Sequence, residues 1–154
     1  MADVTRRDFV KSTAAATALS AASYQRVMGA NERLRIGIIG PGQRGKALMR
    51  NFYTWAQDMN AQMGAVCDIW TKNRELAASL VKQWGGNDAK QHRNMEETLA
   101  DKEIDAVIIA TADFQHAKML EAAVKAGKDV YCEKPMATVL AHAKDAVRAV
   151  HASK

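Results

Sequence analysis

Short uninterrupted runs of hydrophobic residues alternate along this chain with longer stretches in which hydrophobic residues recur every three or four positions. Uninterrupted runs bounded by turn residues predict buried strands, and the helical spacing predicts amphipathic helices. We therefore expect strands at 36–39, 61–67, 104–110 and 130–132, with a weaker edge strand at 89–92. We expect helices at 43–59, 71–84, 113–126 and from 139 onward, with a short helix at 96–100.

The same spacing predicts which face of each helix is buried. In the first predicted helix, Leu48, Phe52, Trp55 and Met59 form an apolar stripe that we expect to pack against the sheet. The corresponding stripes in the second and last helices are Leu76, Leu80 and Trp84, and Val139, Ala143, Val147 and Val150.

Strands that alternate with helices through short turns imply a parallel sheet with right-handed crossovers. The predicted fold class is therefore α/β, a Rossmann-type doubly wound parallel sheet. Ligands of such sheets bind across the carboxyl ends of the strands. Gly40, Asp68, Thr111 and the pair Glu133-Lys134 all follow predicted strands, so we expect them to share one edge, with Glu133 among the cofactor-binding residues.

The first predicted strand runs into G-P-G-Q-R-G, with glycines at 40, 42 and 45. Gly40 permits a sharp turn, Gly42 lets a pyrophosphate approach the backbone, and Gly45 lets the next helix pack closely on the sheet. The N–H groups at the start of that helix favour phosphate charge. We interpret this stretch, including Gln43 and Arg44, as a dinucleotide site; a structural strand–turn–helix is the alternative.

Asp68 ends the second predicted strand, 23 positions after Gly45. A carboxylate there can accept hydrogen bonds from an adenosine ribose and repels a 2′-phosphate, which favours NAD over NADP. Lys72 and Arg74 lie nearby, so NADP remains an alternative cofactor. The alternative role for Asp68 is to cap the following helix.

Glu133-Lys134-Pro135 follows the last predicted strand. A lysine at that position can donate a hydrogen bond or a proton to a substrate oxygen beside a nicotinamide ring. As a bare tripeptide the same residues would be only a charged turn. His116 begins a helix above the same edge, and we interpret it as a solvated or helix-capping residue.

Charge and composition exclude several classes of function. The 22 basic and 17 acidic residues give a net charge of +5, of which residues 1–30 contribute +2, and the basic residues form no run or patch. This argues against nucleic-acid binding, and no apolar stretch is long enough to span a membrane. The two cysteines fall on strands three sheet spacings apart, about 14 Å, so we expect free thiols. No spacing typical of metal ligands occurs.

Residues 1–30 differ in character from the rest of the chain. Thr5-Arg6-Arg7 begins a basic segment that ends at Lys11, and a run rich in small residues follows. This pattern is typical of an export signal, and the paired arginines are similar to a twin-arginine signal. We therefore expect passage through the twin-arginine machinery to the periplasm or cell envelope. A frayed amphipathic helix is the alternative.

Four stretches together resemble the Gfo/Idh/MocA family of oxidoreductases: L-R-I-G-I-I-G-P-G-Q-R-G, A-V-C-D, D-A-V-I-I-A-T and A-V-K-A-G-K-D-V-Y-C-E-K-P-M-A. The resemblance covers about residues 33–151. It implies that residues 31–154 bind NAD or NADP, with Lys134 beside the nicotinamide and substrate. It also supports Gly40, Gly42, Gly45, Asp68 and Thr111 as cofactor contacts, and it implies that the bond into Pro135 is often cis. One departure is Thr111-Ala112, where many members have Thr-Pro.

The resemblance implies hydride transfer between nicotinamide and a sugar or polyol, with Lys134 acting on the substrate oxygen. Members of the family carry a second domain that binds the substrate, so we expect this chain to be the N-terminal piece of a longer protein and inactive by itself; a truncated product is the alternative. Two alternatives stay open: an NAD-dependent glycosidase of the same family, and a nucleotide-binding module without turnover. A homo-oligomer is a further expectation.

Overall fold

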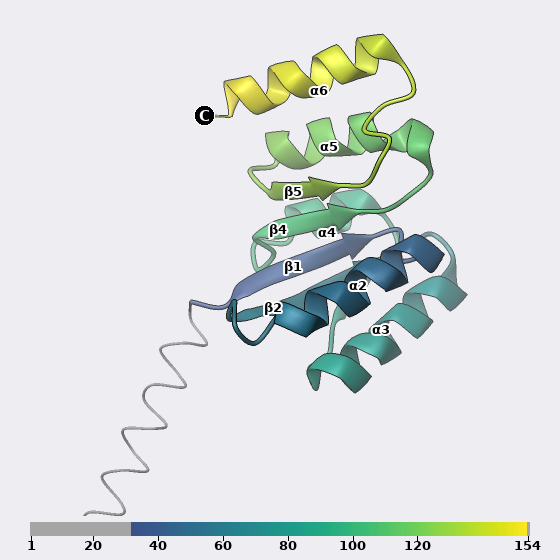
Figure 1. Cartoon of the computed structure of the whole chain (residues 1–154), viewed down its shortest axis with the longest axis vertical. Helices are drawn as coiled ribbons and strands as arrows, with labels where there is room; N and C mark the ends of the chain where they lie inside the picture. The colour runs from purple at the N-terminus through teal and green to yellow at the C-terminus, as the bar shows by residue number, and fades with distance from the viewer. Residues whose placement is uncertain (1–31, 154) are drawn as a thin grey trace, which may run out of the picture. The chain divides into compact units, whose positions relative to one another are not determined.

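The computed structural model of the protein describes residues 32–153. The predicted export signal at 1–30 lies outside the described residues. Five strands and the helices between them alternate in the predicted order (Figure 1). The strands are β1 (Leu34–Ile39), β2 (Ala61–Cys67), β3 (Lys90–His92), β4 (Ala106–Ile109) and β5 (Asp129–Cys132). The helices are α2 (Gln43–Trp55), α3 (Thr71–Gly85), α4 (Met95–Ala100), the 3-10 turn η1 (Asp113–Gln115), α5 (His116–Lys125) and α6 (Leu140–Ala152).

All neighbouring strands pair in parallel, in the order β3-β2-β1-β4-β5. This confirms the Rossmann-type doubly wound sheet. The order reverses at β1, from which the chain continues to β2 on one side and later returns to β4 on the other. Because every strand points the same way, the turns that follow the strands meet at one edge, and the reversal opens a crevice there.

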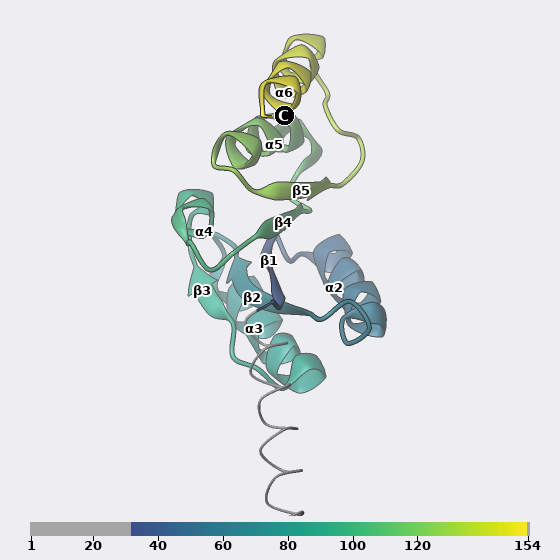
Figure 2. The ribbon, with the colours of Figure 1, turned by 90° about the vertical axis from the view of Figure 1, so that its left-hand side faces the viewer.

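Two hydrophobic cores lie on opposite faces of the sheet, between the strands and the helices that Figure 2 shows on either side of them. Met49 of α2 and Val81 of α3 pack with Ile36, Ile38 and Val66 on one face. On the other face, Ala123 of α5 packs with Ile39, Val107 and Ile109. Side chains of α4 also contribute to this core. Successive strand residues point to opposite faces, so β1 contributes to both cores.

The predicted helix stripes are partly wrong. Helix α2 ends at Trp55, and Trp55 and Met59 are 61% and 56% exposed, whereas Met49 is fully buried. In α3 the buried residues are Ala77 and Val81 rather than Leu76. The close approach of helix to sheet at these positions favours small or flexible side chains over the largest ones.

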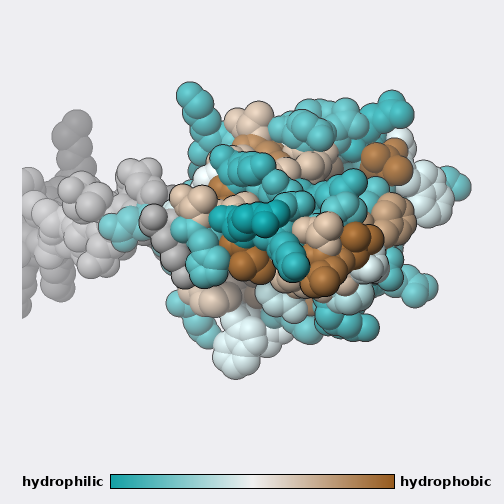
Figure 3. Space-filling model, turned by 90° about the horizontal axis from the view of Figure 1, so that it is seen from above, coloured by the Kyte–Doolittle hydropathy of each residue, from teal (hydrophilic) through white to brown (hydrophobic). Residues whose placement is uncertain are grey.

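Helix α6 packs against α5 and buries Ala146, whereas the predicted inward residues Val139 and Val147 are exposed. Figure 3 looks onto the molecule from the α6 end and shows hydrophobic side chains lying between hydrophilic ones. The predicted stripe of α6 is therefore partly wrong: Ala143 and Val150 are half-buried, but Ala146 takes the buried place predicted for Val147.

The two cysteines are free thiols, as predicted: Cys67 ends β2, Cys132 ends β5, and two strands lie between them. Within residues 32–153, no helix is long and apolar enough to cross a membrane. In the same part of the chain, no group of three or more metal-ligating side chains comes together.

Candidate cofactor site

The glycine turn leaves β1 through a backbone conformation that only glycine adopts readily. Gly40 has a φ of 79°, and a Cβ there would lie 2.7 Å from the Thr111 side chain and 2.9 Å from the Thr111 backbone. A side chain would therefore meet both a conformational penalty and a steric clash. Gly40 brings the turn after β1 into contact with the turn after β4.

The other two glycines have separate roles. Gly45 is buried, and a Cβ there would lie 2.5 Å from the carbonyl oxygen of Gly40. Gly42 donates its backbone N–H to the Gly40 carbonyl at 2.8 Å, yet the position of its missing Cβ has no protein atom within 4 Å. Gly45 is thus required by packing, whereas Gly42 leaves an open space in front of the turn.

The N-terminus of α2 is fit to bind an anion at that space. Gly42 is the N-cap residue, and no side chain of the described residues caps the helix. The first hydrogen bond at this end runs from the Lys46 N–H to the Gly42 carbonyl at 3.0 Å. The N–H groups of Gln43, Arg44 and Gly45 therefore have no intrahelical acceptor, and they lie at the positive end of the helix dipole. These residues fit a pyrophosphate.

An ion pair between the exposed Arg44 side chain and the buried Glu133 carboxylate joins the glycine turn to the end of β5. Arg44 Nε donates to Glu133 Oε1 at 2.5 Å, and its terminal nitrogen also contacts that oxygen. The Lys134 N–H donates to Glu133 Oε2 at 2.8 Å. Glu133 is only 4% exposed, and the hydrogen bonds from Lys134 and Arg44 hold the pKa of its carboxyl below its usual value. The sequence indicated both Arg44 and Glu133 as cofactor residues but not that they pair.

Lys134 follows this pair and is exposed. Its ammonium group forms no hydrogen bond or ion pair with the described residues, and the Lys134–Pro135 peptide is cis, as the resemblance implied. The side chain borders a cavity of about 420 Å³, which we call the Lys134 hollow. The hollow is lined by Arg44, Ala110, Thr111, Asp113, His116, Glu133 and Lys134.

A second cavity of about 470 Å³, the Asp68 cleft, lies beside the Lys134 hollow and shares Ala110 and Thr111 with it. Gly40, Gly42 and Asp68 line the cleft, together with Ile39, Cys67, Ile69, Arg93, Met95, Ala112, Phe114, Gln115 and Met119. The linings of the two neighbouring cavities together include Asp68, the glycine turn and Lys134. Of the predicted site residues, Gln43 and Gly45 line neither cavity: the Gln43 side chain is exposed, and Gly45 is buried.

Asp68 also organises the start of α3. Its Oδ1 accepts a hydrogen bond from the Trp70 N–H at 2.8 Å, and its Oδ2 accepts one from Asn73 at 3.2 Å. Arg74 donates to the Asp68 carbonyl at 2.7 Å. The N-cap residue of α3 is Trp70, and no side chain in the described part of the chain caps the helix. A carboxylate has capacity for further hydrogen bonds, so the contacts of Asp68 leave the ribose role open.

The prediction for His116 is wrong, because the residue is neither solvated nor a cap. It is 2% exposed, and its two ring nitrogens face the carbonyl oxygens of Thr111 and Pro135. A histidine in a polar helix start gives no sequence signal of burial, since burial here depends partly on the turn at Pro135, 19 residues away.

Residues 34–154 match the model of the Gfo/Idh/MocA group, described as an oxidoreductase family with an NAD-binding Rossmann fold. The chain belongs to this family. The Gfo/Idh/MocA assignment agrees with the glycine turn, the sheet order and the cleft, and it identifies the described unit as an NAD-binding Rossmann domain.

Two curated relatives indicate the range of this family. An inositol 2-dehydrogenase/D-chiro-inositol 3-dehydrogenase of Shouchella clausii is 33% identical over 105 residues, which cover 68% of this chain and 29% of the relative. Glycosyl hydrolase family 109 protein 2 of Shewanella sp. (strain ANA-3) is 30% identical over 171 residues, which cover 96% of this chain and 37% of the relative. The chain thus spans about a third of the length of the curated relatives it matches.

A solved structure supports the same assignment. The WlbA dehydrogenase from Bordetella pertussis, crystallised with NADH and UDP-GlcNAcA, superposes with a TM-score of 0.68 at 26% identity. The match covers 79% of this chain and 35% of the WlbA chain. Relatives of this Gfo/Idh/MocA domain have therefore been observed with the reduced form of the cofactor that the fold implies.

Proposed function

We propose that this chain is the cofactor-binding domain of an exported, NAD-dependent oxidoreductase that acts on a sugar or polyol. The observation that carries the proposal is the pair of neighbouring cavities along the carboxyl edge, whose linings follow one another in order. They begin at Asp68, pass the unoccluded Gly42 and end at the unpaired ammonium group of Lys134. The named relatives, which include an inositol dehydrogenase and a sugar-nucleotide dehydrogenase, support the substrate class.

The charges along these cavities fit the parts of a dinucleotide. The free N–H groups of α2 would bind the pyrophosphate, and Asp68 would accept hydrogen bonds from the adenosine ribose. The nicotinamide half would then lie toward Lys134, with Thr111 beside it. When bound, the nicotinamide ring supplies the hydride acceptor.

Lys134 would act on the substrate oxygen. An ammonium group donates a hydrogen bond to a carbonyl oxygen, and the neutral amine accepts the proton that an alcohol loses on oxidation. The neighbouring Glu133 carboxylate forms its ion pair with Arg44, and the Lys134 ammonium group makes no hydrogen bond to it. The lysine is thus available to the substrate.

Titration of the chain with NAD and NADP, followed by calorimetry, tests the cofactor assignment. We expect NAD to bind more tightly than NADP, and the absence of binding by either would contradict the proposal. Asp68→Asn keeps an oxygen for the Trp70 N–H but removes the charge, so we expect the preference for NAD to shrink by about tenfold, roughly 1.4 kcal/mol. An unchanged preference would exclude the ribose contact.

Turnover of NAD with myo-inositol as a probe tests the role of Lys134 in the complete protein. We expect Lys134→Ala to abolish turnover and to leave NAD affinity within about threefold. The ammonium group forms no hydrogen bond or ion pair with the described residues, so its loss should not disturb the turn that carries it. Lys144→Ala on α6 is the matched control, because Lys144 is also an exposed lysine but lies outside both cavities. Equal turnover in the two variants would remove the assigned role.

One observation favours a second enzymatic function, an NAD-dependent glycosidase. The match to the glycosyl hydrolase family 109 protein covers 96% of this chain, so it includes most of residues 1–31 as well as the domain. In such a cycle the cofactor would be used transiently and regenerated. Retention of NAD through purification, with cleavage of a glycoside but no net release of NADH, would distinguish it from a dehydrogenase. A module without turnover would bind NAD and show neither reaction.

Export through the twin-arginine machinery forms part of the proposal and rests on Arg6 and Arg7. Replacement of both by lysine keeps the charge but removes the paired arginines. We expect the protein to move from the periplasmic to the cytoplasmic fraction in the double variant. An unchanged distribution would contradict this route. Sedimentation analysis tests the expected homo-oligomer.

A further inference from the structure

His116 is a buried titratable residue to which the proposed reaction assigns no role. Its Nδ1 lies 2.8 Å from the carbonyl oxygen of Pro135, and its Nε2 lies 3.2 Å from the carbonyl oxygen of Thr111. These two carbonyls belong to the turns after β5 and β4, which are neighbours in the sheet. The imidazole ring therefore bridges two turns that both line the Lys134 hollow.

The chemistry of the two partners restricts the state of the ring. Both are carbonyl oxygens, which only accept hydrogen bonds, and a neutral imidazole carries a single N–H. The shorter distance assigns that N–H to Nδ1, which donates to Pro135; an imidazolium would donate to both carbonyls. Either neutral tautomer leaves one bare nitrogen facing a carbonyl oxygen, and with the N–H on Nδ1 this repulsive contact falls at the longer distance, 3.2 Å to the Thr111 oxygen.

The bond acts directly on the turn that carries Lys134. Pro135 immediately follows Lys134, and on the other side Lys134 is fixed through its own N–H to Glu133. Glu133 is held in turn by Arg44 and by its N–H, which donates to the Ile109 carbonyl at 2.9 Å. The backbone of Lys134 is thus held by the carboxylate before it and by the histidine after it, whereas its side chain is free.

We propose that His116 is a positioning residue: its Nδ1–H holds the Pro135 carbonyl and so aims Lys134 into the hollow between the turns. This inference rests on the proposed function of Lys134. The charged groups that share the hollow with the ring are Arg44, Asp113, Glu133 and Lys134. Arg44 and Glu133 pair with each other. The two hydrogen-bond contacts of the His116 ring are with neutral backbone carbonyls.

Three variants of the chain separate positioning from simple core filling. His116→Asn keeps an amide donor near the place of Nδ1, His116→Gln carries its amide closer to the place of Nε2, and His116→Phe keeps a ring without any donor. In the cofactor-free chain, NMR measures amide hydrogen exchange of Lys134. We expect exchange to rise about 3–10-fold in the Phe and Gln variants, the effect of one lost hydrogen bond, and to stay near wild type in Asn. Exchange of β1 amides serves as the internal control.

A second readout follows the side chain itself. With lysines labelled as ¹³C-dimethyl derivatives, we expect NADH to shift the Lys134 signal in the wild type and the Asn variant, and to shift it less in the other two. A ¹⁵N spectrum of His116 should show a protonated Nδ1. A bare Nδ1, or equal exchange and equal shifts in all variants, would overturn the inference. A wild type that does not bind NADH would instead reject the proposed function, while the exchange data on the cofactor-free chain would still decide the role of His116.

Discussion

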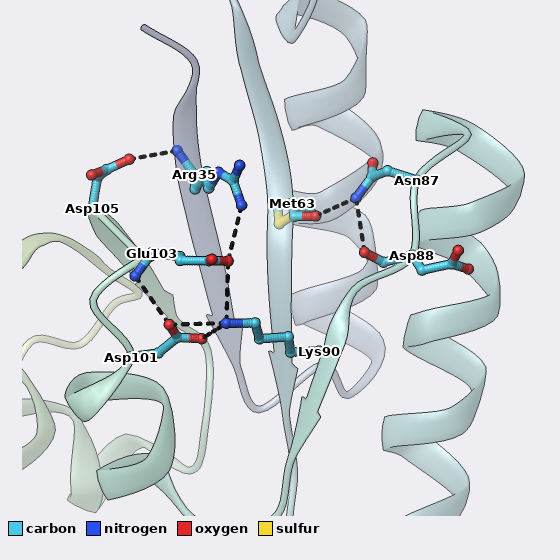
Figure 4. A network of polar contacts seen from close by, with 8 residues as sticks. All are labelled: Arg35, Met63, Asn87, Asp88, Lys90, Asp101, Glu103 and Asp105. Atoms are coloured by element: carbon cyan, nitrogen blue, oxygen red, sulfur yellow. Dashed lines mark hydrogen bonds and ion pairs between the residues drawn. The ribbon is translucent and has the colours of Figure 1, made fainter. Parts of the chain in front are cut away.

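Charged side chains are paired differently at the two edges of the sheet where the strands begin and end. At the amino edge, where the strands begin, charged side chains are paired with one another in a network (Figure 4). Lys90 Nζ contacts both carboxylate oxygens of Asp101, at 2.8 and 3.1 Å, and Glu103 at 3.2 Å. Arg35 donates to Glu103 at 3.0 Å, and its backbone N–H donates to Asp105 at 2.7 Å.

Another lysine at the same edge binds backbone carbonyl groups. Lys128 Nζ donates to the backbone carbonyls of Asp101 and Ile104, at 2.8 and 2.6 Å. At the carboxyl edge, by contrast, the Lys134 ammonium group forms no hydrogen bond or ion pair with the described residues. The N–H groups that begin α2 have no capping side chain there. Where the strands begin, the charged side chains named above are paired with one another or bound to backbone groups. Where a ligand enters, the Lys134 ammonium group and the first N–H groups of α2 stay available beside the Arg44–Glu133 pair. Substitutions at the two edges should therefore separate stability from binding.

The largest effect is expected for Gly40→Ala. The methyl group would meet the Thr111 backbone at 2.9 Å while the residue keeps a positive φ, so both strain and overpacking apply. We expect a loss of about 2–4 kcal/mol in the free energy of unfolding and loss of NAD binding. Denaturant unfolding and calorimetry measure the two effects.

Gly127→Ala is the matched control at the other edge. Gly127 has a φ of 74°, but its Cβ would meet no atom within 4 Å. Its cost should be the conformational term alone, about 1 kcal/mol, with NAD affinity unchanged. Equal stability losses in the two variants would show that contact with Thr111 does not matter.

Lys128→Met should give the next largest effect, on stability alone. It removes the donor from two backbone carbonyls, at a cost of about 1–3 kcal/mol in the free energy of unfolding. NAD affinity should stay within about twofold, because the site lies at the opposite edge. Lys125→Met is the control: Lys125 pairs only with Glu121 on the exposed face of α5, which is worth about 0.3–0.5 kcal/mol. A larger loss in the control would contradict this view of the amino edge.

Gly42→Ala should weaken NAD binding and leave the stability of the fold nearly unchanged. No protein atom lies within 4 Å of the added methyl group, so we expect stability to change by less than about 0.5 kcal/mol. The methyl group would occupy the space in front of α2, and we expect NAD affinity to fall about tenfold or more. Unchanged affinity would mean that the pyrophosphate does not pass this residue. The comparison with Gly40→Ala then separates space for the ligand from space for the fold.

Local patterns predicted the sheet and the place of the site, because strand runs, turn glycines and the residues that follow strands are short-range signals. The exact face of each helix was less accessible: Met49 and Trp55 differ in burial through the shape of the sheet surface, although both fit a helical stripe. The partners of Arg44 and His116 lie 89 and 19 residues away, so no local pattern could indicate these contacts. The sequence thus identified individual site residues, whereas the contacts that hold them together required the fold.

The smallest expected effect is a pH dependence at the amino edge. Burial alone would raise the pKa of Asp101, but hydrogen bonds from Lys90 and from the Glu103 N–H outweigh it and hold that pKa below its usual value. Asp101 therefore adds stability above its ordinary pKa of 3.8, and this stability is lost as the pH falls through the lower folded value. The hydrogen bonds from Lys90 to Asp101 and Glu103 raise the pKa of Lys90, so its contribution is present below 10.5 and is lost as the pH rises above that value.

Lys90→Met should thus reduce stability between about pH 5 and pH 10 and flatten the profile at both ends, as measured by thermal unfolding in a pH series. The pKa of Glu133 is also lowered, so acid weakens both edges and the wild-type profile alone cannot assign the loss. The variant isolates the amino edge, since Glu133 belongs to the other edge and keeps its partner Arg44. Lys82→Met removes an equally short pair with the exposed Asp88 and should leave the shape of the profile unchanged. If Lys90→Met gave the same profile as Lys82→Met, the paired charges at the amino edge would contribute no more than an ordinary surface contact.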